Sequence, residues 1–186
     1  MKFFNQNQSG FTFVELLVVM AIIFLLSGAL LLSAGSESQK LALRNEAFIL
    51  AQNLREVEEM AMAAQAVDCD LGSANIFGVN FNKPGSDWEK SYTIFADCNS
   101  TPNFYFDVND EIIRQVSFDE SVKICSITQP VVDNDLDILF QPPEPVVHID
   151  GITLDQEAII TLCLESDISQ TRQVRINTVG RIEMKK

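Results

Sequence analysis

The feature that most constrains this chain is an uncharged apolar segment close to its amino terminus. Between Lys2 and Glu37 the only charged residue is Glu15, and the 21 residues from Leu16 to Ser36 carry no charge at all. A helix rises about 1.5 Å per residue, so this segment matches the hydrocarbon core of a bilayer, which is roughly 30 Å thick. We therefore expect residues 11–36 to form a helix that spans a membrane once.

A short polar leader precedes the apolar segment. An ordinary secretory signal has its cleavage site after the apolar stretch. Here the residues 1–10, MKFFNQNQSG, come first, and the apolar residues start at Phe11 and continue past Glu15. A carboxylate inside an apolar helix is costly unless a partner compensates its charge. Glu15 is therefore expected to have a specific partner, the simpler alternative being a side chain that reaches the membrane surface.

The run GFTFVELLVVMAII, from Gly10 to Ile23, resembles the class III signal of type IV prepilins and type II secretion pseudopilins. That family has a glycine, an aromatic residue next to it, and a glutamate five residues after the glycine, which correspond to Gly10, Phe11 and Glu15. The resemblance implies cleavage after Gly10 by a membrane prepilin peptidase and methylation of the new Phe11 amine. It also implies that Glu15 pairs with the terminal amine of an adjoining subunit during assembly.

The same resemblance implies partners and a location. The partners are other pilin-like subunits, the prepilin peptidase and a membrane assembly platform. The precursor is expected in the cytoplasmic (inner) membrane with its carboxy-terminal part outside the cytoplasm, and afterwards in a filament or pseudopilus. Many major pilins carry a proline where this chain has Leu32, so the sequence favours a minor pilin or pseudopilin. The alternatives are a major pilin and a single-pass binding protein that never assembles.

Residues 37–66 are expected to continue the helix as an amphipathic segment. They contain neither glycine nor proline, and their apolar residues recur at alternating gaps of three and four. This spacing places one apolar stripe on the helix, which we expect to pack on a sheet rather than form a coiled-coil seam. The stripe consists of Leu43, Ala47, Leu50, Leu54, Val57, Ala61 and Ala64.

Residues 67–186 are expected to form a β-rich domain, because short runs with a period of two follow Asp68. The expected strands are 76–82, 91–96, 112–118, 122–128, 136–141, 157–164 and 172–177. A turn at Gly180 and a last run at 181–184 follow them. The closing segments resemble the domain of GspH/FimT-like minor pseudopilins. The expected fold is α+β and lollipop-shaped, with a long amino-terminal helix packed on an antiparallel sheet or sandwich.

Two groups of residues in this domain suggest local sites. The four cysteines at 69, 98, 125 and 163 allow three disulfide pairings, and outside the cytoplasm such bonds are permitted. Cys69 with Cys98 is favoured because both flank short predicted strands, and free buried thiols are the alternative. Oxygen ligands for calcium are offered by Asp97, Asn99, Asp107 and Asp110, although a solvated acidic turn explains the same residues.

Composition disfavours two further classes of function. The formal net charge of −13 opposes sequence-independent nucleic-acid binding. The candidate basic cluster near the carboxy terminus is better explained as a solvated face of the last hairpin: Arg172, Arg175, Arg181, Lys185 and Lys186. The sequence has no glycine-rich phosphate loop, HExxH or CxxC motif. The single histidine, His148, is expected on an edge strand. We expect no enzymatic activity and no cofactor other than calcium.

Overall fold

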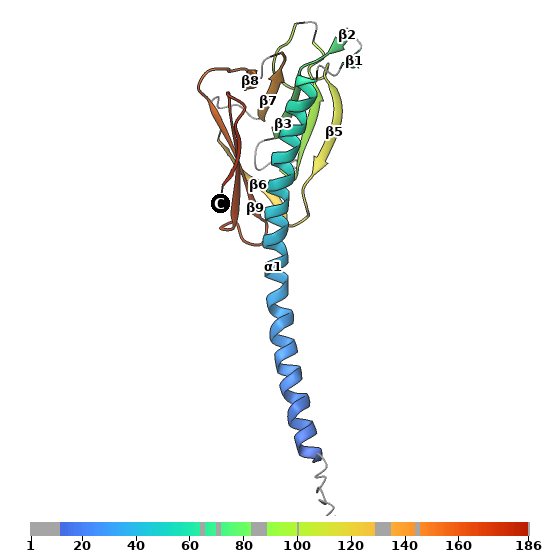
Figure 1. Ribbon diagram of the computed structural model, residues 1–186, viewed down its shortest axis with the longest axis vertical. Helices are drawn as coiled ribbons and strands as arrows, with labels where there is room; N and C mark the ends of the chain where they lie inside the picture. Colours follow the sequence, from blue (N-terminus) through green and yellow to red (C-terminus); the bar gives the residue numbers. More distant parts are fainter. Residues whose placement is uncertain are drawn as a thin grey trace, which may run out of the picture. The chain divides into compact units, whose positions relative to one another are not determined.

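A computed structural model describes residues 12–63, 66–69, 72–82, 89–99, 101–128, 135–143 and 146–185, without the side chains of 29–36 and 72–73. The chain divides into two compact units, residues 1–38 and residues 39–186, and each is described by itself. Helix α1 (Phe13–Met62) is 50 residues long and belongs to both units (Figure 1). The leader 1–10 and Phe11 lie outside the described residues.

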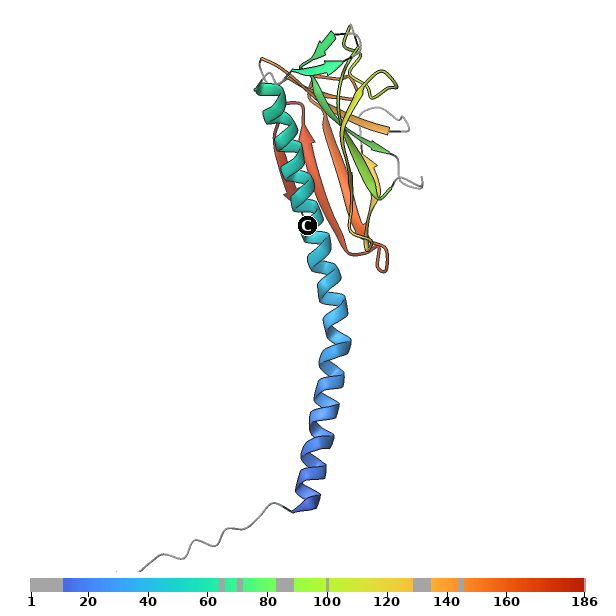
Figure 2. The ribbon, with the colours of Figure 1, turned by 90° about the vertical axis from the view of Figure 1, so that its right-hand side faces the viewer.

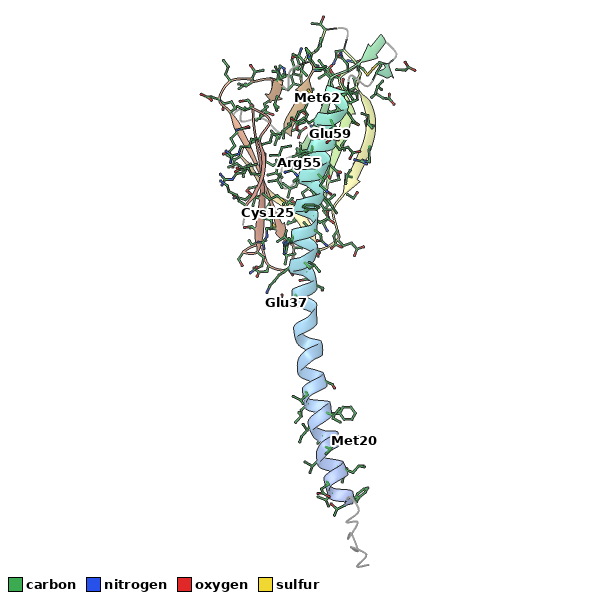
Figure 3. The ribbon with its side chains drawn as sticks, in the orientation of Figure 1. Met20, Glu37, Arg55, Glu59, Met62 and Cys125 are labelled. Atoms are coloured by element: carbon green, nitrogen blue, oxygen red, sulfur yellow. A yellow bond between two sulfur atoms is a disulfide. The ribbon has the colours of Figure 1, made fainter. Side chains whose placement is uncertain are left out.

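The amino-terminal unit consists of the first part of α1. The described side chains around Met20 project from the helix into open space (Figure 3), and Phe24 is 77% exposed. Among the residues described with their side chains, no helix is long and apolar enough to cross a membrane. The expected membrane segment includes residues 29–36, whose side chains lie outside that description. Its crossing of a membrane stays a prediction.

In the carboxy-terminal unit, the rest of α1 packs on strands through the predicted apolar stripe. Six of the seven stripe residues are at most 2% exposed, and the seventh, Ala64, lies outside the described residues. Ala51 is buried as well, while Arg44 and Arg55 on the other faces are exposed. α1 ends at Met62, earlier than predicted, because the chain is already in a strand by Val67.

The described strands form three antiparallel sheets (Figures 1 and 2). A small hairpin joins β1 (Val67–Cys69) to β2 (Gly72–Ala74). A five-stranded sheet has the order β5-β4-β3-β7-β8, with the bounds β3 Phe77–Asn82, β4 Ser91–Ala96, β5 Glu111–Ser117, β7 Asp135–Gln141 and β8 Val146–Ile149. A four-stranded sheet has the order β11-β10-β9-β6, with the bounds β6 Val122–Thr128, β9 Glu157–Leu164, β10 Thr171–Asn177 and β11 Ile182–Lys185.

One core joins α1 to the inner faces of the two larger sheets. Alternate residues of β3, such as Phe77 and Phe81, point into it, and Phe81 lies opposite Tyr92 on β4 and Leu136 on β7. This alternation is the period of two that predicted the strands. The fold is therefore α+β, with a helix packed on antiparallel sheets, and in this respect the prediction is confirmed.

All eight predicted strand runs are found, with ends that differ by at most one residue. The hairpin β1–β2 was not predicted, and no strand run was given for β8, although its His148 was expected on an edge strand. Each is only three or four residues long, so neither has room for a repeated alternation. His148 lies on β8 at the edge of the five-stranded sheet, as expected, but it is only 6% exposed.

Candidate functional site

Of the predicted amino-terminal site, Glu15 is described, whereas Gly10 and Phe11 lie outside the described residues. Glu15 is in the first turn of α1, three residues after Thr12, which directly precedes the helix. Its Oε2 accepts hydrogen bonds from the backbone N–H and from the hydroxyl of Thr12, each at 3.0 Å. The N–H of Glu15 donates in return to the Thr12 hydroxyl oxygen at 3.3 Å.

This reciprocal arrangement is a capping box, in which two residues three positions apart satisfy the N–H groups at the start of a helix. It fixes the direction of the Glu15 side chain along the first turn. Both Thr12 donors bind the same oxygen, so Oε1 is the carboxylate atom that remains for a second donor. The sequence did not predict Thr12 as part of the site, although a threonine three residues before a glutamate is the usual signature of this cap.

Both pairs of cysteines are joined in disulfides. Cys69 bonds to Cys98, the pair that the sequence favours, and it links the end of β1 to the residues after β4. Cys125 bonds to Cys163 and links the neighbouring strands β6 and β9, at the point where their register shifts. The distances between Cα atoms are 5.7 and 5.8 Å. No free cysteine remains.

The four candidate calcium ligands are brought together in the loop between β4 and β5. The side-chain amide of Asn99 donates to Asp97 at 3.3 Å, to Asp107 at 3.2 Å and to Asp110 at 3.5 Å. The Asp110 carboxylate also accepts the backbone N–H groups of Cys98 and Asp107. These oxygens are thus engaged by donors of the loop itself.

In the part of the chain that the structure describes, no three or more His, Cys, Asp or Glu side chains are placed to hold a metal ion. Burial raises the pKa of the Asp110 carboxyl, whereas a hydrogen bond from the Asn109 backbone lowers the pKa of Asp107. Calcium binding stays a prediction.

The same loop covers the outer face of the five-stranded sheet, which the sequence did not predict. We call residues 101–110 the strap. Its three consecutive aromatic residues each contact the sheet or the turn after β8. The rings of Phe104 and His148 are stacked, with their centroids 3.7 Å apart, and the ring centroids of Phe106 and Phe95 are 4.9 Å apart. The hydroxyl of Tyr105 donates to the carbonyl oxygen of Asp150 at 3.0 Å. Burial lowers the pKa of His148.

The candidate basic cluster is partly neutralised by acidic neighbours. Arg175 lies 3.7 Å from the carboxylate of Glu157, and Arg181 and Lys185 both pair with Glu183. Lys186 lies outside the described residues. The structure therefore places Arg175, Arg181 and Lys185 in ion pairs with carboxylates, whereas Arg172 donates to the carbonyl of Thr171.

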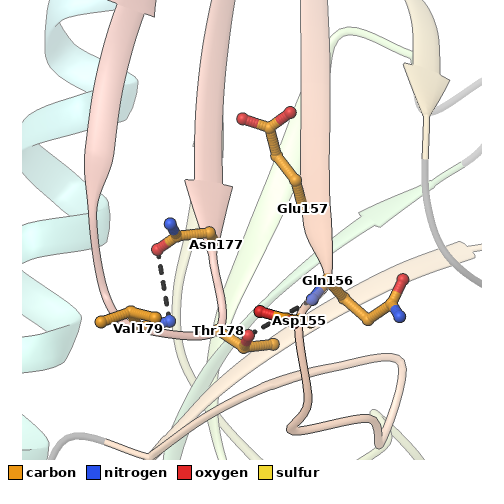
Figure 4. Close-up of a pocket in the computed structure, with 6 residues that line it drawn as sticks. All are labelled: Asp155, Gln156, Glu157, Asn177, Thr178 and Val179. Atoms are coloured by element: carbon orange, nitrogen blue, oxygen red, sulfur yellow. Dashed lines mark hydrogen bonds between the residues drawn. The ribbon is translucent and has the colours of Figure 1, made fainter.

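A shallow polar hollow of about 230 Å³ lies beside the turn that follows β10 (Figure 4). It is lined by Asp155, Gln156, Glu157, Asn177, Thr178 and Val179. Asn177 accepts the N–H of Val179, and the hydroxyl of Thr178 accepts the N–H of Gln156. The side chains of Asn177 and Thr178 therefore stabilise the turn, which gives these two residues of the hollow a structural role.

Comparison with known proteins identifies the amino-terminal segment. Residues 5–31 match the family model described as "Prokaryotic N-terminal methylation motif". No curated protein matches the sequence. Two crystal structures of the type IV minor pilin FimU of Pseudomonas aeruginosa are similar over 77% of this chain, both at 14% identity. They are covered over 88% and 93% of their own chains, with TM-scores of 0.47 and 0.45.

Proposed function

We propose that this chain is a minor pilin or pseudopilin, a structural subunit of a type IV pilus or a type II secretion-like filament rather than an enzyme. The observation that carries the proposal is the methylation motif over residues 5–31, because it contains Gly10, Phe11 and Glu15 together. The leader ends at Gly10, and glycine leaves the backbone before Phe11 open to a peptidase. The apolar helix stays on the mature chain.

Processing and assembly follow from the chemistry of these residues. Hydrolysis of the bond between Gly10 and Phe11 by the prepilin peptidase releases the leader and creates a positively charged amine, which is then methylated. Thr12 holds the Glu15 carboxylate through Oε2. The amine of an adjoining subunit then binds Oε1, which compensates a charge that an apolar surrounding would otherwise penalise. A misplaced neighbour leaves the charge unpaired, so the pair selects the axial register.

The proposed partners are other pilin-like subunits, the prepilin peptidase and a membrane assembly platform. The precursor resides in the inner membrane with residues 67–186 outside the cytoplasm, where the two disulfides of the carboxy-terminal unit are chemically permitted. The absence of a proline at Leu32 supports a minor role. Nucleic acid is not a proposed partner, because the chain carries a net charge of −13 and three of its hairpin cations, Arg175, Arg181 and Lys185, are paired with carboxylates.

Quantitative immunoblotting of sheared filaments and of inner membranes tests this function. A minor subunit is expected in both fractions, and in the filament fraction far below the amount of the most abundant subunit. If this chain were instead the most abundant subunit of the filament fraction, it would be a major pilin. Complete absence from filaments of every kind, with the chain intact in the membrane, would support the non-assembling binding protein.

A further inference from the structure

Two aspartates are buried side by side on the outer face of the five-stranded sheet, beneath the strap. Asp137 on β7 is 6% exposed, and Asp150, which follows β8, is 3% exposed. Charged aspartates are rarely buried to this degree unless their charge is compensated. Asp137 lies opposite Asn80 on β3, and the Asn80 amide donates to its Oδ1 at 2.9 Å.

The two aspartates are locked together by their backbones. The N–H of Asp150 donates to the carbonyl of Asp137 at 2.9 Å, and the N–H of Asp137 donates to Oδ1 of Asp150 at 3.0 Å. Asp150 and Gly151 both have positive φ angles, +48° and +72°, so this turn has a fixed and unusual shape. The Asp150 carboxyl group is therefore held at the backbone of Asp137 by the turn.

The strap closes directly over this pair. The backbone N–H of Phe106 donates to the Asp137 carboxyl group, and the hydroxyl of Tyr105 donates to the carbonyl of Asp150 at 3.0 Å. A Cβ on Gly151 would lie 2.7 Å from the Tyr105 hydroxyl, so the glycine makes room for this contact. Closure of the strap thus removes Asp137 from water while the carboxyl of Asp150 is held next to it.

We propose that Asp137 is a proton-controlled latch: the strap lies closed over the sheet when Asp137 is protonated and is released when Asp137 ionises. Protonation removes the charge that closure buries and the repulsion between the two neighbouring carboxylates. Release frees the strap's aromatic residues, Phe104, Tyr105 and Phe106, from the sheet. The latch is a property of the carboxy-terminal unit and does not depend on the proposed filament role.

The pKa of Asp137 supports closure of the strap at low pH and its release at higher pH. Burial raises the pKa of Asp137 to about 6. The hydrogen bonds from Asn80 and Phe106 lower this pKa, whereas the charges of Asp150 and Asp135 raise it further. With the strap open, Asp137 returns toward an ordinary pKa of about 4. The closed strap is therefore stabilised fully below about pH 4 and loses that stabilisation as the pH rises to about 6. A difference of about two units between the pKa of Asp137 with the strap closed and with the strap open changes the ratio of open to closed strap by up to about 100-fold.

A further titratable group on this side is His148 on β8. Burial lowers its pKa, so its protonation at low pH opposes burial and acts in the opposite direction to Asp137. Within the strap and next to it, Asp97, Asp107 and Asp110 bond to Asn99 and to loop backbone. A test must therefore separate Asp137 from His148.

Fluorine NMR of the full chain in detergent micelles, with 3-fluorotyrosine in place of tyrosine, measures the latch directly. The chain has two tyrosines, Tyr105 in the strap and Tyr92 in the core, and Tyr105→Phe assigns the two signals. Between pH 3.5 and 7 we expect the Tyr105 signal to move with a midpoint between the open-strap pKa of about 4 and the closed-strap pKa of about 6, while the Tyr92 signal stays still. Asp137→Asn should abolish the step, and Asp150→Asn should lower its midpoint, because the charge of Asp150 raises the pKa of Asp137.

The matched control is Asp155→Asn, on an exposed turn outside the strap, which should leave the midpoint unchanged. An unmoving Tyr105 signal in the wild type would overturn the proposal. So would a step that persists in Asp137→Asn or disappears in His148→Gln. If the Tyr92 signal shows that Asp137→Asn does not fold, the midpoint in Asp150→Asn decides: an unchanged midpoint contradicts the latch.

Discussion

The carboxylate of Glu15 is held by Thr12 through two hydrogen bonds of 3.0 Å to the same oxygen, while the Glu15 N–H donates back to the Thr12 hydroxyl. The glutamate therefore has a partner within its own helix before any neighbouring subunit arrives. In the proposed assembly, a neighbour's amine adds to this arrangement through the second oxygen and need not displace Thr12. The cap thus orients the charge that we propose for assembly.

Replacing Thr12 by valine should weaken the start of α1 by about 1 kcal/mol, because valine keeps the shape of threonine but lacks the capping hydroxyl. Hydrogen exchange at the Glu15 amide, followed by NMR in detergent micelles, should become about five-fold faster. Thr12→Ser keeps the hydroxyl and should exchange like the wild type. Equal exchange rates in all three chains would show that the cap does not form.

Replacing Glu15 by alanine should leave membrane insertion and leader cleavage intact, since losing a charge makes insertion of an apolar helix easier. Incorporation into filaments should fall at least about ten-fold, because a neighbour's amine loses its partner, worth roughly 1.5–3 kcal/mol. Immunoblots of sheared filaments measure this. Glu37→Ala is the control, as the next acidic residue beyond the apolar segment, and should assemble normally. Normal assembly of Glu15→Ala contradicts the pairing.

Removing either disulfide should destabilise the carboxy-terminal unit by roughly 3–4 kcal/mol, since the bonds close loops of 29 and 38 residues. Thermal unfolding of Cys69→Ala/Cys98→Ala and of Cys125→Ala/Cys163→Ala measures the two effects separately. Each midpoint should fall by several degrees, and reduction of the wild type should cost more than either pair alone. A double variant as stable as the wild type would mean that its bond adds nothing.

The sequence predicted the elements of this fold better than the contacts between them. Alternation placed the longer strands and the spacing of Leu43, Leu50 and Leu54 placed the buried stripe, because both signals repeat along the chain. The strand β8 was missed as an element, since four residues do not show a period. The helix end was placed too late because the residues up to 66 are good helix formers, and propensity alone does not show where β1 begins.

The site was predictable where one short motif carries it and not where distant segments meet. Gly10, Phe11 and Glu15 lie within six residues of one another, so the sequence alone brings them together. Asp137 and Asp150 meet only through the pairing of β7 with β8 and the turn that follows. The candidate calcium ligands do lie together in one loop, but the sequence did not predict that Asn99 and loop N–H groups bind their oxygens, and calcium binding stays a prediction.

Replacing Gly10 by leucine separates processing from assembly. The leader position lies outside the carboxy-terminal unit, so folding and membrane insertion should survive. Cleavage before Phe11 should fail, because a bulky side chain crowds the peptide bond that the peptidase attacks. Fractionation and immunoblotting should show a form larger by the ten-residue leader, confined to the membrane and absent from filaments. Gly10→Ala, with a smaller side chain, should be cleaved better, and wild-type mobility of Gly10→Leu would mean that the leader is read differently.

The amino-terminal residue of the membrane-extracted protein tests the account most directly. Mass spectrometry of the intact chain and of its first peptide distinguishes a processed from an unprocessed terminus without any mutation. Our account predicts a chain that begins at Phe11, with one methyl group on its amine and without the ten residues from Met1 to Gly10. A mature chain that still begins at Met1 would contradict the proposed function.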